Sequence, residues 1–592
     1  MATQPFPLKV PPGIVKSEGA NVVMGRYTDS DKIVFYRGRA QKWAGWERTT
    51  DETLLGTCRG ALSWSNKYAE LNAAFGTTYK LYVLFDDATV SDITPIRSSA
   101  TIDNNPIATT SGSPIVSITH TGHTAAAGSY VTFSGATAVG GITISGEYQI
   151  TSVTSTSVYT ITHSSSAASS ATGGGASVLA EYQLDAAPSG ILRYGWGGGG
   201  WGDSTWGTSR LTGVPIGDRT WSMSEYGNDL LASPFGGGIY LWEQATDARA
   251  EVLAGAPVSC RFMFVTPERF IFALGAGPDA TTPMRVRWPD QDDPTDWEPT
   301  DDNSANIRDL QSGSVLVGGI PLSDGVSAVW SDTSLYIFQY TGGDFVYDSR
   351  LAGTHCGLIA PLAVTQVSGV PYWVSQNGFH LYAGGVQFIP NSADVKDYVF
   401  GRMAKAHVNK MFVIYDRERN VIRWHYCATG STEPDSYVDV AVGDWVWTVG
   451  TLDRTGGTPY RESDNTILLV DPDGVVYSHG IGVDADGEAM EAYLEYGLYE
   501  ISNASMSVDV MGIIPECAEQ VGDLDYEIYT KERPNSAANL DEQTVTMGPT
   551  DEIGDARVAG RHFGMTVRSN VVGGDFRLGV VSLEIGGSGK RR

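Results

Sequence analysis

Short apolar and β-branched runs alternate with turn signals over most of the 592 residues. Within residues 349–390, the runs 372–375 and 379–382 have the aromatic composition typical of strands. Asn377-Gly378 between them suits the two positive φ values of a type I′ turn, and a second glycine turn precedes a third apolar run at 386–389. Three strands joined by tight turns form a meander that cannot bury both faces alone. The pattern therefore predicts one blade of a β-propeller, packed beside others of its kind.

Similar paired runs recur along the chain. They are 80–85 with 90–95, 229–233 with 239–242, 270–273 with 284–288, 334–338 with 345–347, and 467–470 with 475–477. The turns are unevenly spaced, since Gly378 and Gly474 alone are 96 residues apart, whereas regular propeller repeats keep a period of about 40 to 50 residues. This spacing predicts an irregular propeller with long loops. No segment shows a sustained helical period.

The composition changes at two places, which gives the predicted domain organisation. Residues 99–181 are rich in Ser, Thr, Gly and Ala and still alternate, which predicts an inserted small β-sandwich-like domain. Beyond residue 502, longer strictly alternating runs predict a C-terminal antiparallel β-domain. The predicted all-β fold has five segments: 1–56 (N-terminal lead and docking segment), 57–98 (first propeller hairpins), 99–181 (insertion), 182–501 (remainder of the propeller) and 502–592 (C-terminal β-domain and basic tail).

The formal net charge is −28, and charged residues make up only 18% of the chain. Proteins that grip nucleic acid through its phosphates do so with Lys and Arg, so this charge speaks against that class of binding. It does not exclude a protein past which DNA slides, where attraction would act as friction. Solubility alone explains the charge equally well.

Five widely spread cysteines, with no CxxC pair, indicate assembly in a reducing compartment rather than a disulfide framework or a zinc site. The N-terminus, MATQPFPLKVPPG, lacks the apolar region of a signal peptide. No run of about 18 apolar residues occurs either. We expect a protein that is neither secreted through a signal peptide nor membrane-spanning.

A basic and aromatic cluster in the N-terminal lead is a candidate docking surface. Its members are Arg37, Arg39, Lys42, Trp43, Trp46 and Arg48. An edge strand with solvated charges explains these residues equally well. A second candidate is a tryptophan-glycine tract that could gate a bore, because glycines permit motion and tryptophans fill space. Its tryptophans are Trp196, Trp201 and Trp206, and packing of a long loop is the alternative.

Few residues of the chain are candidates for catalysis or metal binding. His120 and His123 have no carboxylate or thiol nearby in sequence, so we expect no metal site. The Asp-Gly segments at 471–474 and 484–488 lack the later carboxylates of a calcium loop and are more typical of hairpin turns. The acidic tract 290–296 has carboxylates that a hydrolase could use, or is an inter-strand loop. We therefore predict no catalytic residues, no cofactor and no metal, and a structural or binding role.

The segment Leu351-Ala352-Gly353-Thr354-His355-Cys356-Gly357, followed by the aromatic strand 372–374, resembles a segment of a known family. That family is the tail hub or tail nozzle proteins of short-tailed bacteriophages (podoviruses), also called packaged-DNA stabilisation proteins. Residues 313–390 and 561–585 carry most of the likeness. The insertion at 99–181 and the tryptophan-glycine tract depart from the family pattern, which leaves open the surfaces that meet neighbouring subunits.

The resemblance implies a structural virion protein without catalytic activity, assembled in the host cytoplasm and located in the virion tail. It implies a homo-oligomer, a hexameric ring below the portal and its adaptor, which also meets tail fibre or spike proteins. The ring would retain packaged DNA and conduct it during ejection through an acidic lumen, without sequence recognition. Such a lumen repels phosphates along its length. In this reading His355 and Cys356 are packing residues.

Two alternatives stay open. One is a carbohydrate-binding or glycan-degrading propeller, such as a tailspike or a sialidase-like enzyme, suggested by the tryptophan-rich loops and the acidic tract. The other is a scaffold propeller of a cell. Turnover on polysaccharide would distinguish the first alternative, and the neighbouring genes would distinguish the second.

Overall fold

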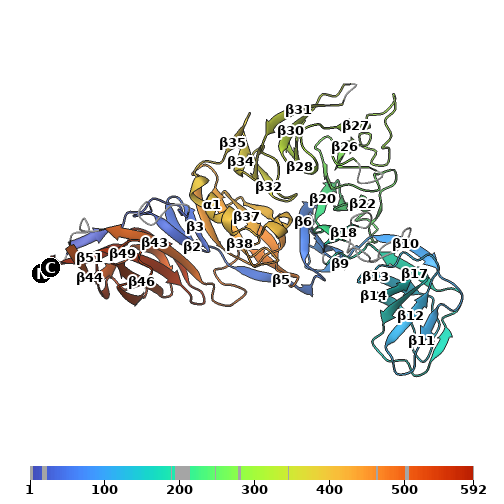
Figure 1. Cartoon of the computed structure of the whole chain (residues 1–592), viewed down its shortest axis with the longest axis horizontal. Helices are drawn as coiled ribbons and strands as arrows, with labels where there is room; N and C mark the ends of the chain where they lie inside the picture. Colours follow the sequence, from blue (N-terminus) through green and yellow to red (C-terminus); the bar gives the residue numbers. More distant parts are fainter. Residues whose placement is uncertain are drawn as a thin grey trace. The chain divides into compact units, whose positions relative to one another are not determined.

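The computed structural model describes residues 4–16, 23–188, 190–193, 214–246, 248–277, 282–323, 325–343, 346–461, 465–500 and 506–590. The chain divides into two compact units. Unit 1 consists of Met1–Asp51, Asp332–Tyr336 and Leu351–Arg592, and unit 2 of Glu52–Ser331 and Ile337–Arg350. Figure 1 draws the strands in sequence colours.

Four antiparallel meanders of four strands each lie wholly or mostly in unit 2. The first contains β6 (Cys58–Ser65), β7 (Leu71–Thr77), β8 (Leu81–Phe85) and β9 (Val90–Asp92). The second contains β20 (Trp221–Tyr226), β21 (Asp229–Pro234), β22 (Tyr240–Trp242) and β23 (Glu251–Val252). The third contains β24 (Phe262–Val265), β25 (Ile271–Leu274), β26 (Arg285–Trp288) and β27 (Asn306–Asp309). The fourth contains β28 (Leu316–Ser323), β29 (Val326–Ser331), β30 (Ser334–Tyr340) and β31 (Tyr347–Thr354). The strands β18 (Ile191–Arg193) and β19 (Val214–Gly217) form a separate pair.

Three further four-stranded sheets lie in unit 1. The first contains β32 (Val364–Val367), β33 (Val370–Ser375), β34 (Gly378–Tyr382) and β35 (Val386–Phe388). The second contains β36 (Phe412–Asp416), β37 (Val421–Tyr426), β38 (Ser436–Ala441) and β39 (Val446–Thr451). The third contains β40 (Gly456–Arg461), β41 (Thr466–Val470) and β42 (Val475–His479), and is completed by β5 (Trp46–Thr53) from the N-terminal segment. Meanders of this kind are propeller blades, so the predicted all-β, irregular propeller fold is confirmed.

The insertion forms an eight-stranded sheet with its own core in unit 2. Its strands are β10 (Ile96–Thr101), β11 (Ile107–Thr109), β12 (Ile115–Thr119), β13 (Tyr130–Ser134), β14 (Gly146–Ser155), β15 (Val158–Thr162), β16 (Ala171–Gly173) and β17 (Leu179–Gln183). The alternating threonine-rich strands turn residues such as Ile118, Phe133 and Ile161 inward, where they are fully buried. The first and last strands of the insertion, β10 and β17, pair with each other, with Ile96 opposite Gln183. The chain therefore leaves and rejoins the blades at one place.

Three sheets near the C-terminus combine both ends of the chain. The first is β1 (Gln4–Pro7), β51 (Ser582–Lys590), β44 (Met506–Ile514) and β48 (Gly554–Gly560). The second is β2 (Tyr27–Asp31), β43 (Ala492–Glu500), β49 (His562–Ser569), β46 (Leu524–Lys531) and β47 (Asp541–Met547). The third is β3 (Ile33–Tyr36), β4 (Arg39–Lys42), β50 (Asp575–Leu578) and β45 (Cys517–Val521). In Figure 1 the blue N-terminal strands accordingly lie among the red ones.

This arrangement differs from the predicted boundaries at both ends. The lead 1–56 is no separate segment, because its strands complete C-terminal sheets and one blade. The C-terminal domain takes in β43, before residue 502. The predicted basic tail is a strand as far as Lys590, which pairs with Met506. Pairings between residues several hundred positions apart leave no local signal, which is why composition alone did not reveal them.

The strand and turn at 349–390 also differ in detail. Residues up to Thr354 belong to β31 of the preceding sheet, and the blade itself begins at β32. Ser375 pairs with Gly378, so the turn residues are 376 and 377. Gly378 has φ +141° and Asn377 has no positive φ, so the predicted type I′ turn at 377–378 is wrong. Asn377 is held instead by its own N–H, which donates to Ser375 Oγ, and by its side chain, which donates to His355 O.

One helix, α1 (Ala393–Arg402), and a 3₁₀ segment, η1 (Lys405–Lys410), were not predicted. The helix buries Val395 and Val399, four residues apart, and ten residues offer too short a repeat to stand out in sequence. Within the described residues, no helix is long and apolar enough to cross a membrane.

Candidate functional site

The predicted docking cluster in the N-terminal lead is only partly exposed. Lys42 is 3% exposed, and its Nζ donates to Gly574 O at 2.7 Å. Trp46 is also buried, stacked on His479 with ring centroids 5.0 Å apart. Arg37, Arg39 and Arg48 are exposed. The structure therefore divides the cluster into exposed arginines and buried residues that anchor the lead inside unit 1, so the six residues do not form one docking face.

Trp43 is the centre of this anchoring. Its ring stacks on Tyr437 with centroids 5.5 Å apart and an interplanar angle of 10°. The guanidinium group of Arg423 lies over the rings of both Trp43 and Tyr437. Cation–π contacts of this kind strengthen when they are removed from water. The lead is thus fixed against strands β37 and β38 by an aromatic and cationic stack.

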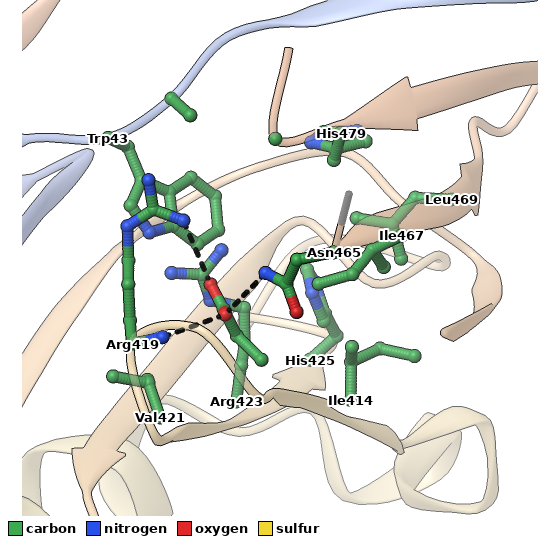
Figure 2. A pocket seen from close by; sticks show the side chains of 13 residues that line it. Trp43, Ile414, Arg419, Val421, Arg423, His425, Asn465, Ile467, Leu469 and His479 are labelled. Atoms are coloured by element: carbon green, nitrogen blue, oxygen red, sulfur yellow. Dashed lines mark hydrogen bonds and ion pairs between the residues drawn. The ribbon is translucent and has the colours of Figure 1, made fainter. Parts of the chain in front are cut away.

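A small cavity of about 40 Å³ opens beside Trp43. That volume holds about three water molecules. Its apolar walls include Trp43, Ile414, Val421, Ile467 and Leu469, and its polar groups are Asp416, Arg419, Arg423, His425, Asn465 and His479. Figure 2 shows Trp43, Arg419 and Arg423 on one side and Ile467, Leu469 and His479 on the other. The cavity therefore lies where β36 and β37 face β41 and β42.

The acidic group of the cavity is already satisfied. Asp416 accepts hydrogen bonds from the N–H of Arg419 at 3.1 Å and from Asn465 Nδ2 at 3.0 Å. It also pairs with Arg419 Nη1 at 3.2 Å. Asp416 thereby orders the loop after β36 and is not free to attract a cation.

Two buried histidines line the cavity in different states of hydrogen bonding. His479 accepts a bond at Nε2 from Arg454 Nε at 3.1 Å. His425 is fully buried and stacks in parallel on Phe412, with centroids 4.6 Å apart. Neither ring nitrogen of His425 has a hydrogen-bond partner among the described residues. Burial, and then the positive charges of Arg423 and Arg454, hold the pKa of His425 well below its usual range.

This site was missed by sequence reasoning, although a signal exists. Arg423 and His425 stand two positions apart in the otherwise apolar run of β37, so both point to one face of the strand. Polar residues at such a spacing inside a buried strand indicate partners on neighbouring strands. What the sequence does not show is that Asp439, directly opposite Arg423 on β38, is one of those partners.

A serine and a histidine also meet in the blade at β33 and β34. Ser375 Oγ lies 2.9 Å from His380 Nε2, the spacing of a nucleophile and its base. Both side chains are buried. Burial is the main cause that lowers the pKa of His380 to about 4, which makes it a weak base. We interpret the pair as a buried hydrogen bond that closes the hairpin.

The segment that carries the family resemblance packs tightly. Trp373 Nε1 donates to Cys356 O at 2.7 Å, and Cys356 N donates to Thr333 O. A Cβ atom on Gly357 would lie 2.2 Å from the backbone of Asp332. Burial raises the pKa of the Cys356 thiol, whereas His355 is exposed and contacts Thr354. These two residues do not form a hydrogen-bonded pair with each other.

The acidic tract 290–296 forms a loop with local hydrogen bonds. Asp290 accepts bonds from Ser304, and Asp293 accepts bonds from Thr295. These bonds are the main reason that the pKa values of both carboxyls are lowered, opposite to what a general acid needs. Asp292 pairs with Arg269 at 2.7 Å. These local hydrogen bonds are typical of an inter-strand loop, the alternative to a hydrolase site for this tract.

The other candidates form ordinary local contacts. His120 Nδ1 lies 2.7 Å from Tyr182 OH, and His123 Nε2 lies 2.9 Å from Ser155 O. Asp471 accepts the N–H groups of Asp473 and Val475, which closes the β41–β42 hairpin. In the part of the chain that the structure describes, no three His, Cys, Asp or Glu residues are grouped as a metal site would need. Trp196, Trp201 and Trp206 lie outside the described residues.

No protein-family model matches the chain, and no curated protein matches it. Among solved structures, it is similar to a catalytically inactive virginiamycin B lyase from Staphylococcus aureus with quinupristin, at 7% identity and TM-score 0.27, over 48% of this chain and 93% of the other. A chain of a mitotic checkpoint complex matches at 9% identity and TM-score 0.30, over 65% and 95%. The phage phi92 endosialidase matches at 10% identity and TM-score 0.15, over 80% and 53%. With TM-scores this low, none of these likenesses bears on function.

Proposed function

We propose that this protein is a structural component of a bacteriophage tail, a homo-oligomeric tail tube or nozzle that retains packaged DNA and conducts it during ejection. The observation that carries the proposal is the net charge of −28. Six copies around one bore would multiply that charge. Phosphates passing a bore of net negative charge are repelled, so the DNA slides instead of binding.

The N-terminal lead is incorporated into the C-terminal sheets, and this arrangement supports a structural role. The lead contributes β1 to β4 to the C-terminal sheets and β5 to a propeller blade. Two residues of the lead also anchor it to unit 1: Trp43 stacks on Tyr437, and the buried Lys42 donates to Gly574 O. Pulling on such a segment must break several sheets at once, which suits a part that bears load during packaging and ejection.

The resemblance at 351–357 adds the rest of the proposal. It supports a hexameric ring below the portal and its adaptor, with tail fibre or spike proteins as further partners. The tight packing at Gly357 and Cys356 supports a structural part for this segment.

Gold-labelled antibodies against the chain test the proposal on purified tailed particles viewed in negative stain. The proposal expects label at the tail and none on the capsid. A parallel assay for turnover of polysaccharide distinguishes the glycan-degrading alternative. Turnover that is lost in the variant Asp292→Asn/Asp293→Asn would overturn the structural role.

A further inference from the structure

We propose that the cavity beside Trp43 is a binding site for a small oxyanion such as inorganic phosphate or sulfate. This inference does not depend on the role in a phage tail. It rests on the cavity, on buried nitrogen atoms that lack partners, and on the guanidinium groups beside them.

Two described side chains that line the cavity carry buried nitrogen atoms without a partner. His425 is fully buried and has no hydrogen-bond partner for either ring nitrogen among the described residues. Arg419 Nε is likewise buried without a partner in the described part of the chain. Arg423 also lines the cavity, and its Nε and Nη2 bind Asp439. Buried polar groups are nearly always hydrogen-bonded, so these nitrogen atoms favour a ligand that brings acceptor oxygens into the cavity.

Guanidinium groups gather around the cavity, and each has acidic neighbours. Arg419 and Arg423 line it, and Arg454 stands behind His479 as a third guanidinium group. Asp416 and Glu418 pair with Arg419, and Asp439 pairs with Arg423, so each of these carboxylates is held by a guanidinium group. An oxyanion here would therefore be bound by the geometry of the donors and not by an excess of positive charge.

The size and rigidity of the cavity restrict the ligand. About 40 Å³ is far below the roughly 300 Å³ at which drug-sized ligands begin to fit. The rings of His425 and Phe412 are parallel, and Trp43 is stacked on Tyr437. Donors held in place by such stacks lose little freedom when a ligand binds, which favours a small, compact anion with several acceptor oxygens.

The proposed oxyanion site is tested by calorimetric titration of the full-length protein with inorganic phosphate. Chloride keeps the ionic strength constant during the titration. We expect one saturable site per chain with Kd of about 1 mM or lower. Sulfate is expected to compete. If phosphate gives no saturable heat, the cavity holds only water and the assignment is overturned.

Two variants and a control localise the binding. His425→Phe keeps an aromatic ring on Phe412 and removes both nitrogens, and should weaken phosphate binding at least tenfold. Arg419→Gln, at a partly exposed position, should also weaken phosphate binding. This second variant keeps the proposal testable if His425→Phe misfolds. His380→Phe changes a buried histidine that does not line the cavity and should leave Kd unchanged. Unchanged binding in folded His425→Phe or in Arg419→Gln would contradict the site.

Discussion

Arg423 and Asp439 face each other across β37 and β38 and form a two-point ion pair, with side chains only 6% and 3% exposed. Nε of Arg423 donates to Oδ1 at 2.6 Å, and Nη2 donates to Oδ2. A pair buried this deeply adds little net stability compared with apolar residues, because both charges lose their hydration. Losing one partner is costly, since the other charge is then buried alone.

Asp439→Asn should therefore lower the free energy of unfolding by about 3–5 kcal/mol. The double variant Arg423→Met/Asp439→Leu should recover most of that loss, because no charge remains buried. Urea unfolding followed by tryptophan fluorescence measures both. An Asp439→Asn variant as stable as the wild type would show that the Arg423–Asp439 pair is solvated.

The buried histidines predict a loss of stability in mild acid. Burial is the first cause that lowers the pKa values of His425, His479 and His380, the last to about 4. Below about pH 6.5 the unfolded chain takes up protons on these residues and the folded chain does not, so the unfolded state is favoured as pH falls. Each histidine contributes up to about 1.4 kcal/mol per pH unit.

Urea unfolding of the wild type and of His425→Phe at pH 7, 6 and 5 measures this effect. The wild type should lose stability relative to the variant as pH falls, because the variant cannot take up that proton when it unfolds. Parallel pH profiles for the two proteins would show that His425 is not held neutral by the fold.

Gly357 predicts a steric effect in the segment that resembles the phage family. A Cβ atom at this position would lie 2.2 Å from the carbonyl carbon and oxygen of Asp332, and backbone cannot move aside as a flexible side chain does. Gly357→Ala should destabilise the protein by about 3 kcal/mol, at the upper end for overpacking. Gly385→Ala is the matched control, because nothing lies within 4 Å of its added Cβ. Equal thermal midpoints for the two variants would contradict this packing.

Lys80 joins the inserted domain to the first blade of unit 2. Its Nζ lies 2.7 Å from Asp92 on β9 and 2.5 Å from Glu147 on β14, and the Lys80 side chain is 7% exposed. Lys80→Met should cost about 2–3 kcal/mol, because the two carboxylates then share only Arg249. Arg557→Met is the control, since the pair of Arg557 with Asp555 is highly exposed and should contribute under about 1 kcal/mol. Thermal unfolding compares the two variants. Similar midpoints for Lys80→Met and Arg557→Met would show that Lys80 does not anchor the inserted domain.

The parts of the fold that were predicted depend on neighbours in sequence. The β41–β42 hairpin was expected from an Asp-Pro-Asp-Gly turn between two apolar runs, and Asp471 closes that turn as its side-chain chemistry suggests. The alternating strands of the insertion were found for the same reason. Local turn residues and alternation are sufficient where strands pair with the next strand along the chain.

The parts that were not predicted depend on distant partners. Tyr27 pairs with Tyr496, and Trp43 stacks on Tyr437, contacts that composition and periodicity do not encode. The lead therefore looked like a docking surface, although Lys42 and Trp46 are buried within unit 1. The cavity was missed because its walls come from β36, β37, β41 and β42 and from Trp43 of the lead, and only the fold brings them together.

The central claim is that this chain forms a homo-oligomeric ring in a phage tail. The most direct test is the mass and stoichiometry of the chain in assembled tailed particles, by quantitative mass spectrometry of particles and mass measurement of tails released from them. The account predicts six copies per particle, an assembly of about 380 kDa for chains of 63.4 kDa. Particles that lack the chain, or that carry it as a stable monomer, would contradict the account.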